Sequence, residues 1–189
     1  MGSRLTQTQR SLIIGTILGD GYLRIVPKRK NAFLEINHSV KQRAYVEWKY
    51  NILRSIVKSA PKLRNGNGHR IACRFFTRFL PEITEIHKTF YTNKKKIIPD
   101  NLIIDPIGLA VWYMDDGSKS GGSIYFNTQQ FSLADQKRLQ VLLLNRFSIR
   151  SNLNRDKEYF RIRVVSKDAV KLSRLIRKYI PESMQYKLV

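Results

Sequence analysis

Sulfur ligands and histidines are nearly absent from this sequence of 189 residues. Cys73 is the single cysteine, so the chain forms no internal disulfide, and a reducing compartment is expected. The three histidines, His38, His69 and His87, lie far apart and share no ligand spacing with Cys73. A structural zinc site needs about four Cys and His ligands, so none is expected.

Long apolar runs are missing as well. The longest uncharged run near Pro106 covers residues 106–114, which is too short for a membrane-spanning helix of ~20 residues. The N-terminal stretch MGSRLTQTQR holds no apolar core of the kind found in signal peptides. These two absences predict a protein that does not reside in a membrane.

Acidic residues are the third scarce class. The chain has 35 Lys and Arg against 14 Asp and Glu, a net charge of +21, while 42% hydrophobic residues suffice for a buried core. Such an excess of one sign destabilises a compact chain through self-repulsion, so a polyanionic partner is expected. Nucleic acid is the first candidate and an anionic membrane surface the second. Because the basic residues are spread along the chain among Tyr and Phe, nucleic acid is favoured.

The sequence contains an internal repeat. Residues 13–21 (IIGTILGDG) and 109–117 (LAVWYMDDG) each end an apolar segment with an acidic residue and a glycine. The IPD of residues 98–100 corresponds to the IPE of residues 180–182. After each apolar helix we expect strand, strand, helix, strand, strand, helix. A repeat of one unit implies two pseudo-twofold halves, hence an α+β protein with two antiparallel sheets, each covered by helices on one face.

Apolar spacing and turn residues predict where the elements lie. Leu23 and Ile25 are expected on one face of the first hairpin and Arg24 on the other. A glycine-rich turn is expected at residues 65–68. The predicted helices cover residues 8–18, 41–58, 82–90, 106–114, 132–146 and 168–179. The predicted strands lie within residues 22–26, 33–39, 62–76, 123–129 and 150–165.

The paired acidic residues point to metal chemistry. One Asp-Gly step is ordinary turn chemistry. A carboxylate at a helix C-terminus, however, meets the negative end of the helix dipole, and two such helices packed together would bring Asp20 and Asp116 close. Divalent metal ions between or beside them would relieve this repulsion. Carboxylate oxygens suit Mg²⁺, and metal ions at such sites activate water for phosphodiester cleavage.

These two segments resemble the signature of the LAGLIDADG homing endonucleases, in the monomeric branch that carries two copies per chain. The resemblance extends from about residue 8 to residue 188. It implies two αββαββα halves, residues 1–101 and 102–189, with the motif helices at their interface and the two sheets forming a DNA-binding saddle. Residues 13–21 and 109–117 are the two motifs.

Small residues let the motif helices approach closely in this family. Gly15 and Gly19 fit that pattern in the first copy. Val111 and Asp115 stand at the same positions in the second, so its helix is expected to contact its partner differently, through Ala110.

The resemblance also implies a metal site. The last acidic residue of each motif, Asp20 and Asp116, would hold the catalytic metal ions, helped by the backbone carbonyls of Gly19 and Asp115. The expected cofactor is Mg²⁺. Mn²⁺ is expected to substitute for it, and Ca²⁺ to bind without supporting cleavage.

Further catalytic candidates come from matching segments. The family places a lysine near each scissile phosphate, which corresponds to Lys96 and Lys187 here. For Lys96 the alternative is a solvated basic run. Gln130 or Gln129 would position a water, and a capping or turn role before Ser132 is an equal alternative.

The expected partner is double-stranded DNA with a long, pseudo-asymmetric target site, bound by a monomer. A curved antiparallel sheet fits the major groove, where base edges carry a full hydrogen-bonding code. Glu35, Asn37 and Asn127 would read bases, and the basic loops 28–30 and 155–157 would meet phosphates. The expected DNA contacts are Arg24, Lys28, Arg29, Lys30, Glu35, Asn37, Arg64, Arg70, Arg74, Asn127, Gln129, Arg155, Lys157, Arg161 and Arg163.

Two other functions fit parts of the pattern. An RNA-splicing maturase on the same fold would bind intron RNA without cleaving it, yet both aspartates are present. A non-catalytic DNA-binding protein would explain the charge and leave the paired carboxylates unexplained. The expected setting is intracellular, in an organelle (mitochondrion or chloroplast) or a microbial cytoplasm, where genes of this family are commonly carried by introns.

Overall fold

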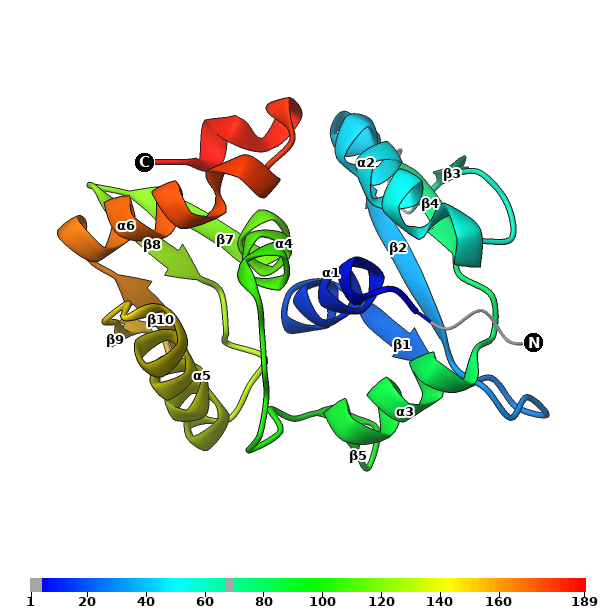
Figure 1. Cartoon of the computed structure of the whole chain (residues 1–189), viewed down its shortest axis with the longest axis horizontal. Coiled ribbons are helices and arrows are strands. Elements are labelled where there is room, and N and C mark those ends of the chain that lie inside the picture. Colours follow the sequence, from blue (N-terminus) through cyan, green and yellow to red (C-terminus); the bar gives the residue numbers. More distant parts are fainter. Residues whose placement is uncertain (1–4, 67–69) are drawn as a thin grey trace.

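The computed structural model describes residues 5–66 and 70–189, and in it two halves flank a central pair of helices (Figure 1). The first half comprises α1 (Gln7–Leu18), β1 (Tyr22–Arg24), β2 (Phe33–Ser39), α2 (Arg43–Leu53), β3 (Lys62–Asn65), β4 (Ile71–Phe76) and α3 (Pro81–Phe90). The second comprises α4 (Pro106–Asp116), β7 (Gly117–Ser120), β8 (Ser123–Phe126), α5 (Leu133–Phe147), β9 (Asn152–Asp156), β10 (Tyr159–Val164) and α6 (Ser166–Ile176). The predicted αββαββα order is therefore confirmed in both halves.

Short elements complete the chain. A small hairpin of β5 (Tyr91–Thr92) and β6 (Lys95–Lys96) follows α3. Single 3₁₀ turns flank α2, namely η1 (Val40–Gln42) and η2 (Arg54–Ile56). Two more follow α6, η4 (Arg177–Tyr179) and η5 (Glu182–Lys187). No helix in the described ranges is long and apolar enough to cross a membrane.

Both large sheets are antiparallel and have the same topology. The strand orders are β1-β2-β4-β3 and β7-β8-β10-β9. Apolar residues at alternate positions, such as the paired Leu23 and Leu34, are fully buried under the helices. Leu63 and Ile71, on the same face in β3 and at the start of β4, are exposed. Ile25, expected beside Leu23, is instead 43% exposed, because β1 ends at Arg24 and the alternation stops there. The predicted turn at residues 65–68 lies partly outside the described residues.

The core of the interface is the crossing of α1 and α4 (Figure 1). A side chain at Gly15 would collide with the carbonyl oxygen of Gly108 and stand 2.9 Å from the Cβ of Val111. A Cβ at Gly108 would in turn lie 3.1 Å from the carbonyl oxygen of Ser11. On α4, Gly108 therefore permits the approach, and Ala110, the expected contact, is fully buried.

Capping groups fix where these two helices begin. Thr6 and Gln9 form a capping box at the start of α1. Asp105 caps α4 by accepting from the backbone N–H of Gly108, and Pro106 opens that helix. The hydroxyl of Ser11 donates to the carboxylate of Asp105 at 2.5 Å, which ties the start of α4 to the side of α1. The two motif helices are thus held together at the end remote from the acidic residues.

Candidate active site

The C-termini of α1 and α4 carry the two motif aspartates. Asp20 follows the last residues of α1, and Asp116 is the last residue of α4. Each is followed by a glycine whose missing side chain is required by the chain path. A Cβ at Gly21 would lie 2.6 Å from the carbonyl oxygen of Thr16, and one at Gly117 would overlap the ring and carbonyl of Tyr113. The glycine of each motif thereby fixes the turn that presents its aspartate.

Both carboxylates resist ionisation in this setting. Burial raises the pKa of Asp116 to about 7, and the negative charges of Asp20 and Asp115 add to the shift. Desolvation by neighbouring protein atoms raises the pKa of Asp20, and Asp115 adds to it. The three lysines Lys49, Lys96 and Lys187 oppose the shift at Asp20. Neither carboxylate has a hydrogen-bond donor among the described residues, so both oxygen pairs are free to bind a cation.

The donor set at this position fits Mg²⁺. The described part of the chain holds no cluster of three or more His, Cys, Asp or Glu side chains suited to a metal. Mg²⁺ commonly takes one or two protein carboxylates and completes its octahedron with water and substrate phosphates. The residues that would hold the ion are Asp20 and Asp116.

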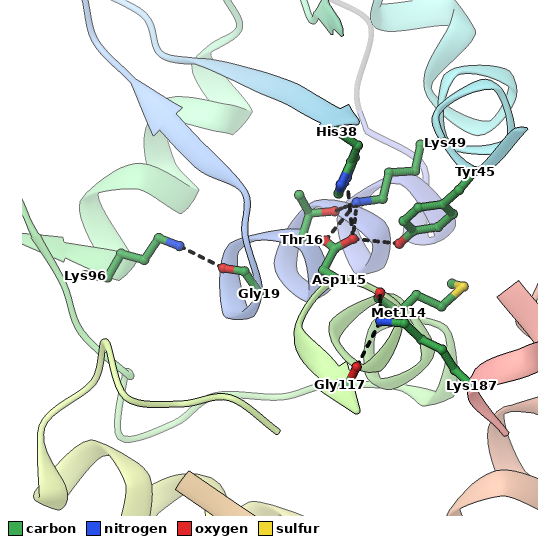
Figure 2. A network of polar contacts seen from close by, with 10 residues as sticks. All are labelled: Thr16, Gly19, His38, Tyr45, Lys49, Lys96, Met114, Asp115, Gly117 and Lys187. Carbon is green, nitrogen blue, oxygen red and sulfur yellow. Dashed lines mark hydrogen bonds and ion pairs between the residues drawn. The ribbon is translucent and has the colours of Figure 1, made fainter. Parts of the chain in front are cut away.

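Lys96 reaches the end of α1 from the small β5–β6 hairpin. Its Nζ donates to the carbonyl oxygen of Gly19 at 3.0 Å (Figure 2). It also donates to the carbonyl oxygen of Ile17 at 2.9 Å and to Oε1 of Gln130 at 3.4 Å. Gln130 also donates to the carbonyl of Gly19 at 3.3 Å. Burial lowers the pKa of Lys96 to about 8. The structure thus places two predicted catalytic side chains, Lys96 and Gln130, beside the helix end that carries Asp20.

Lys187 takes the corresponding place at α4. It comes from η5, and its Nζ donates to the carbonyl oxygens of Met114 at 2.6 Å and Gly117 at 2.9 Å (Figure 2). Burial lowers the pKa of this ammonium group also. The C-terminal end of each motif helix is therefore met by one lysine from its own half.

Asp115 behaves unlike the other acidic residues of the site. Its carboxylate, fully buried, accepts from Lys49 Nζ at 2.7 and 2.8 Å and from the hydroxyl of Tyr45 at 2.8 Å (Figure 2). Lys49, also fully buried, donates to Oγ1 of Thr16 at 3.2 Å. His38 Nε2 lies 3.7 Å from the carboxylate, and burial lowers the pKa of His38 to about 4, so the imidazole is neutral.

The sequence prediction missed this network. The sequence predicts only that Tyr45 and Lys49 lie in a helix over residues 41–58, and it leaves His38 as an isolated histidine. One signal was available, because Lys49 falls in the same helical stripe as the buried residues Tyr45, Val46 and Leu53. A lysine on an apolar face needs a buried partner, and Asp115 is that partner.

The first sheet presents the predicted DNA-contacting side chains on one face. The strand register places Arg24, Glu35, Asn37, Arg64 and Arg74 on the side away from the buried apolar residues. Glu35 accepts from Arg24 at 3.1 Å and from Arg74 at 3.3 Å. This face is therefore an ordered array of charged groups rather than a set of independent side chains.

The second sheet carries an arginine and aromatic array. Arg161 and Arg163 lie over the ring of Tyr125, with guanidinium carbons 4.4 and 5.8 Å from its centroid. Arg161 also donates to the side chain of Asn127 at 3.4 Å. Gln129 donates to Asp156 at 2.9 Å rather than pointing to the carboxylate site.

The remaining basic candidates lie at the edges of the sheets. Lys28, Arg29 and Lys30 are exposed in the loop between β1 and β2, and Arg70 is exposed just before β4. Lys157 is exposed in the turn after β9. The prediction of a loop at Arg155 is wrong, since Arg155 lies in β9 opposite Phe160 and its register places it on the other face from Arg161.

The chain is similar to a known family of proteins and to several individual proteins. The model of the LAGLIDADG DNA endonuclease family matches residues 10–172. A probable intron-encoded endonuclease 1 from Wickerhamomyces canadensis is 30% identical over 203 residues, covering 98% of this chain and 85% of the relative. The cytochrome b mRNA maturase bI2 of Debaryomyces hansenii is 30% identical over 138 residues, which cover 71% of this chain and 53% of the maturase.

A solved structure is similar over the whole chain. The homing endonuclease I-WcaI, described as bound to its DNA recognition sequence, matches with a TM-score of 0.91 and 29% identity. The match covers 100% of this chain and 88% of that one. With the two motifs, the paired halves and these matches in agreement, the chain belongs to the LAGLIDADG DNA endonuclease family.

Proposed function

We propose that this chain is a homing endonuclease that makes double-strand breaks at one long DNA site by metal-dependent phosphodiester hydrolysis. The observation that carries the proposal is the pair of motif aspartates at the ends of two helices in close contact. Asp20 and Asp116 have raised pKa values and no hydrogen-bond donors in the described residues. Together they would hold a divalent metal ion, preferably Mg²⁺, with the carbonyls of Gly19 and Asp115 as additional oxygen donors. The bound ion would supply an activated water and stabilise the leaving oxygen.

The lysines have a role that follows from their hydrogen bonds. An ammonium group has three donors. Lys187 uses two of them on backbone carbonyls and, within the described residues, has a third free to reach a phosphate oxygen. Lys96 directs its third donor to Gln130 at 3.4 Å, a long contact that a phosphate could replace. A fixed cation beside the scissile phosphate stabilises the charge that develops on it, and Gln130 would then be free to orient a water.

The partner in this proposal is double-stranded DNA, bound by one copy of the chain across both sheet faces. The arginines on those faces and the net charge of +21 support it. The relative's description as intron-encoded supports an intron setting for this chain as well. An organelle or a microbial cytoplasm is the compartment that we propose for it.

The maturase relative supports a second candidate function. Its 30% identity makes intron RNA a partner worth testing on the same protein. In that case binding would favour structured intron RNA over duplex DNA, and the motif aspartates would be dispensable for it.

The test is a cleavage selection from a randomised duplex library with Mg²⁺, followed by a plasmid assay on the selected site. We expect the wild-type protein to linearise the plasmid, and Asp20→Asn or Asp116→Asn to lose at least about 10²-fold in rate while DNA binding persists. Asp100→Asn makes the same change in charge at an exposed carboxylate and serves as the control. Full cleavage by either motif variant would reject the site. Failure of the wild type to cut any library member would reject the activity.

A further inference from the structure

A buried ion pair joins the two halves directly beneath the candidate active site. The side chains of Lys49 and Asp115 are both completely shielded from solvent. Desolvating two charges is so costly that apolar residues of similar size are often as stabilising or more so. Stability alone therefore does not explain why a lysine and an aspartate occupy this position.

The pair crosses the interface between the halves, with the acid from the second half and the base from the first. Asp115 belongs to α4, whereas its partners Tyr45 and Lys49 belong to the first half. Thr16, whose hydroxyl accepts from Lys49, belongs to the first half as well. Gly19 provides the room, because a Cβ there would lie 2.5 Å from the Cβ of Asp115. The carboxylate of α4 thus crosses the first motif at a position that has no side chain of its own.

The second half, which is described throughout residues 102–189, has no equivalent of this pair. The buried positions of α2, residues 45, 46, 49 and 53, correspond to the buried positions 135, 136, 139 and 143 of α5. Lys49 is thereby matched by Leu139, and Asp115 is matched by Gly19 of the first motif. The Lys49–Asp115 pair therefore breaks the symmetry between two halves that otherwise share one order of elements.

We infer that Lys49 and Asp115 are positioning residues that hold α4 at one rotation and depth against α1, so that Asp116 and Asp20 face the same metal site. The inference rests on the proposed function. Asp115 and Asp116 are consecutive, as are Gly19 and Asp20, so a shift at the Asp115 anchor is passed to Asp116 through one peptide unit. Lys49 contacts both carboxylate oxygens and Tyr45 contacts one of them, which fixes the orientation of the carboxylate as well as its place.

Four variants test this inference. Lys49→Met and Asp115→Asn each leave one partner unmatched, and the double variant Lys49→Met/Asp115→Asn removes both charges. Tyr45→Phe removes one hydrogen bond and keeps the pair, so it is the variant with the smallest effect on folding. Each is measured in three ways: thermal unfolding, Mn²⁺ binding to the protein by electron paramagnetic resonance, and single-turnover cleavage of the selected duplex.

The double variant separates positioning from stability. We expect it to recover most of the unfolding midpoint lost in the single variants, yet to bind Mn²⁺ and cleave DNA about 10- to 100-fold more weakly than the wild type, as is usual when groups that orient metal ligands are removed. Tyr45→Phe should lie between the wild type and the double variant. The matched control is Arg150→Met/Asp168→Asn, an ion pair at the start of α6 away from the site, which should leave Mn²⁺ binding and cleavage unchanged.

The possible results distinguish the positioning role of Lys49 and Asp115 from the proposed endonuclease function. Wild-type Mn²⁺ affinity and cleavage in a folded double variant would overturn the inference and leave the proposed function intact. A wild-type protein that neither binds Mn²⁺ nor cleaves any duplex would overturn both. Loss of both readouts in the double variant and retention of both in the Arg150/Asp168 control would support the inference.

Discussion

The two halves share one order of elements but differ beneath the active site. In the first half the position under the motif is polar, because Lys49 donates to the carboxylate of Asp115 and to the hydroxyl of Thr16. In the second half the corresponding residues are Trp112 and Leu139, both fully buried, and Trp112 stacks on Phe126 with ring centroids 4.1 Å apart. A chain that carries both copies can divide a complementary pair between them, whereas a symmetric dimer would have to place both partners in every copy.

The largest difference between the halves should appear in stability. Lys49→Met leaves the buried carboxylate of Asp115 without its cation, which should cost about 3–5 kcal/mol in the free energy of unfolding. Leu139→Met at the equivalent position conserves volume and should cost less than about 1.5 kcal/mol. Chemical denaturation of the two variants measures both values. Equal losses in the free energy of unfolding would show that the Lys49–Asp115 pair stabilises the fold no more than Leu139 does.

The two active-site lysines provide a second comparison. Lys96→Met and Lys187→Met should each slow cleavage by about 10²-fold, the usual loss when one electrostatic group of a transition state is removed. If each lysine serves the strand nearest its helix, each variant should accumulate nicked plasmid before linear plasmid. The alternative role is that of a cation on helix-terminal carbonyls. In that case the unfolding midpoint would fall and the cleavage rate of the folded protein would stay at the wild-type value.

The facing positions 19 and 115 allow a double-mutant cycle. Gly19→Ala should destabilise the protein by about 1–3 kcal/mol, because the new methyl group would collide with the side chain of Asp115. Asp115→Gly empties the opposite position, so the combined variant should recover part of that cost. A coupling energy of about 0.5–3 kcal/mol is expected for residues in such contact. Additive effects within about 0.3 kcal/mol would indicate that the two positions do not face each other.

The smallest effects are expected on the sheet faces. Arg163 has no acidic partner in the described residues, whereas Arg74 is paired with Glu35. Arg163→Ala should therefore lower the slope of log affinity against log salt by about 1, and Arg74→Ala by less. Arg174→Ala on the exposed side of α6 is the control and should leave the slope unchanged. Binding isotherms on the selected duplex at several salt concentrations measure these slopes. Equal slopes for all three variants would show that the sheet faces do not contact the DNA.

Local patterns were sufficient to predict much of the molecule. Apolar periodicity and turn residues predicted the helices, and alternation predicted the sheet faces. The family resemblance implied that Asp20 and Asp116 hold the metal and that Lys96 and Lys187 lie near the scissile phosphates. The structure brings each lysine to the end of a motif helix. These features depend on residues near one another in sequence or on a repeat that the sequence itself displays.

The partners of Asp115 could not be predicted, because they depend on contacts across the interface between the halves. The direction of the Asp115 side chain follows from the space at Gly19 and from a lysine buried 66 residues earlier in the chain, and neither is visible in the motif itself. The early end of β1 at Arg24 and the strand register of Arg155 were missed too, although each of these strands pairs with the next strand in the sequence. Periodicity locates a buried face, whereas the partner of a charge on that face is set by the tertiary structure.

The central claim is that Asp20 and Asp116 share a metal site that the Lys49–Asp115 pair holds in place. Its most direct test is a crystal structure of the protein with its selected duplex and Ca²⁺. We expect an ion whose ligands include carboxylate oxygens of both Asp20 and Asp116 at about 2.3–2.6 Å. The carboxylate of Asp115 should remain on Lys49. An ion bound away from either aspartate, or one to which Asp115 has turned its carboxylate, would contradict the placement of the active site and the positioning role of the buried pair.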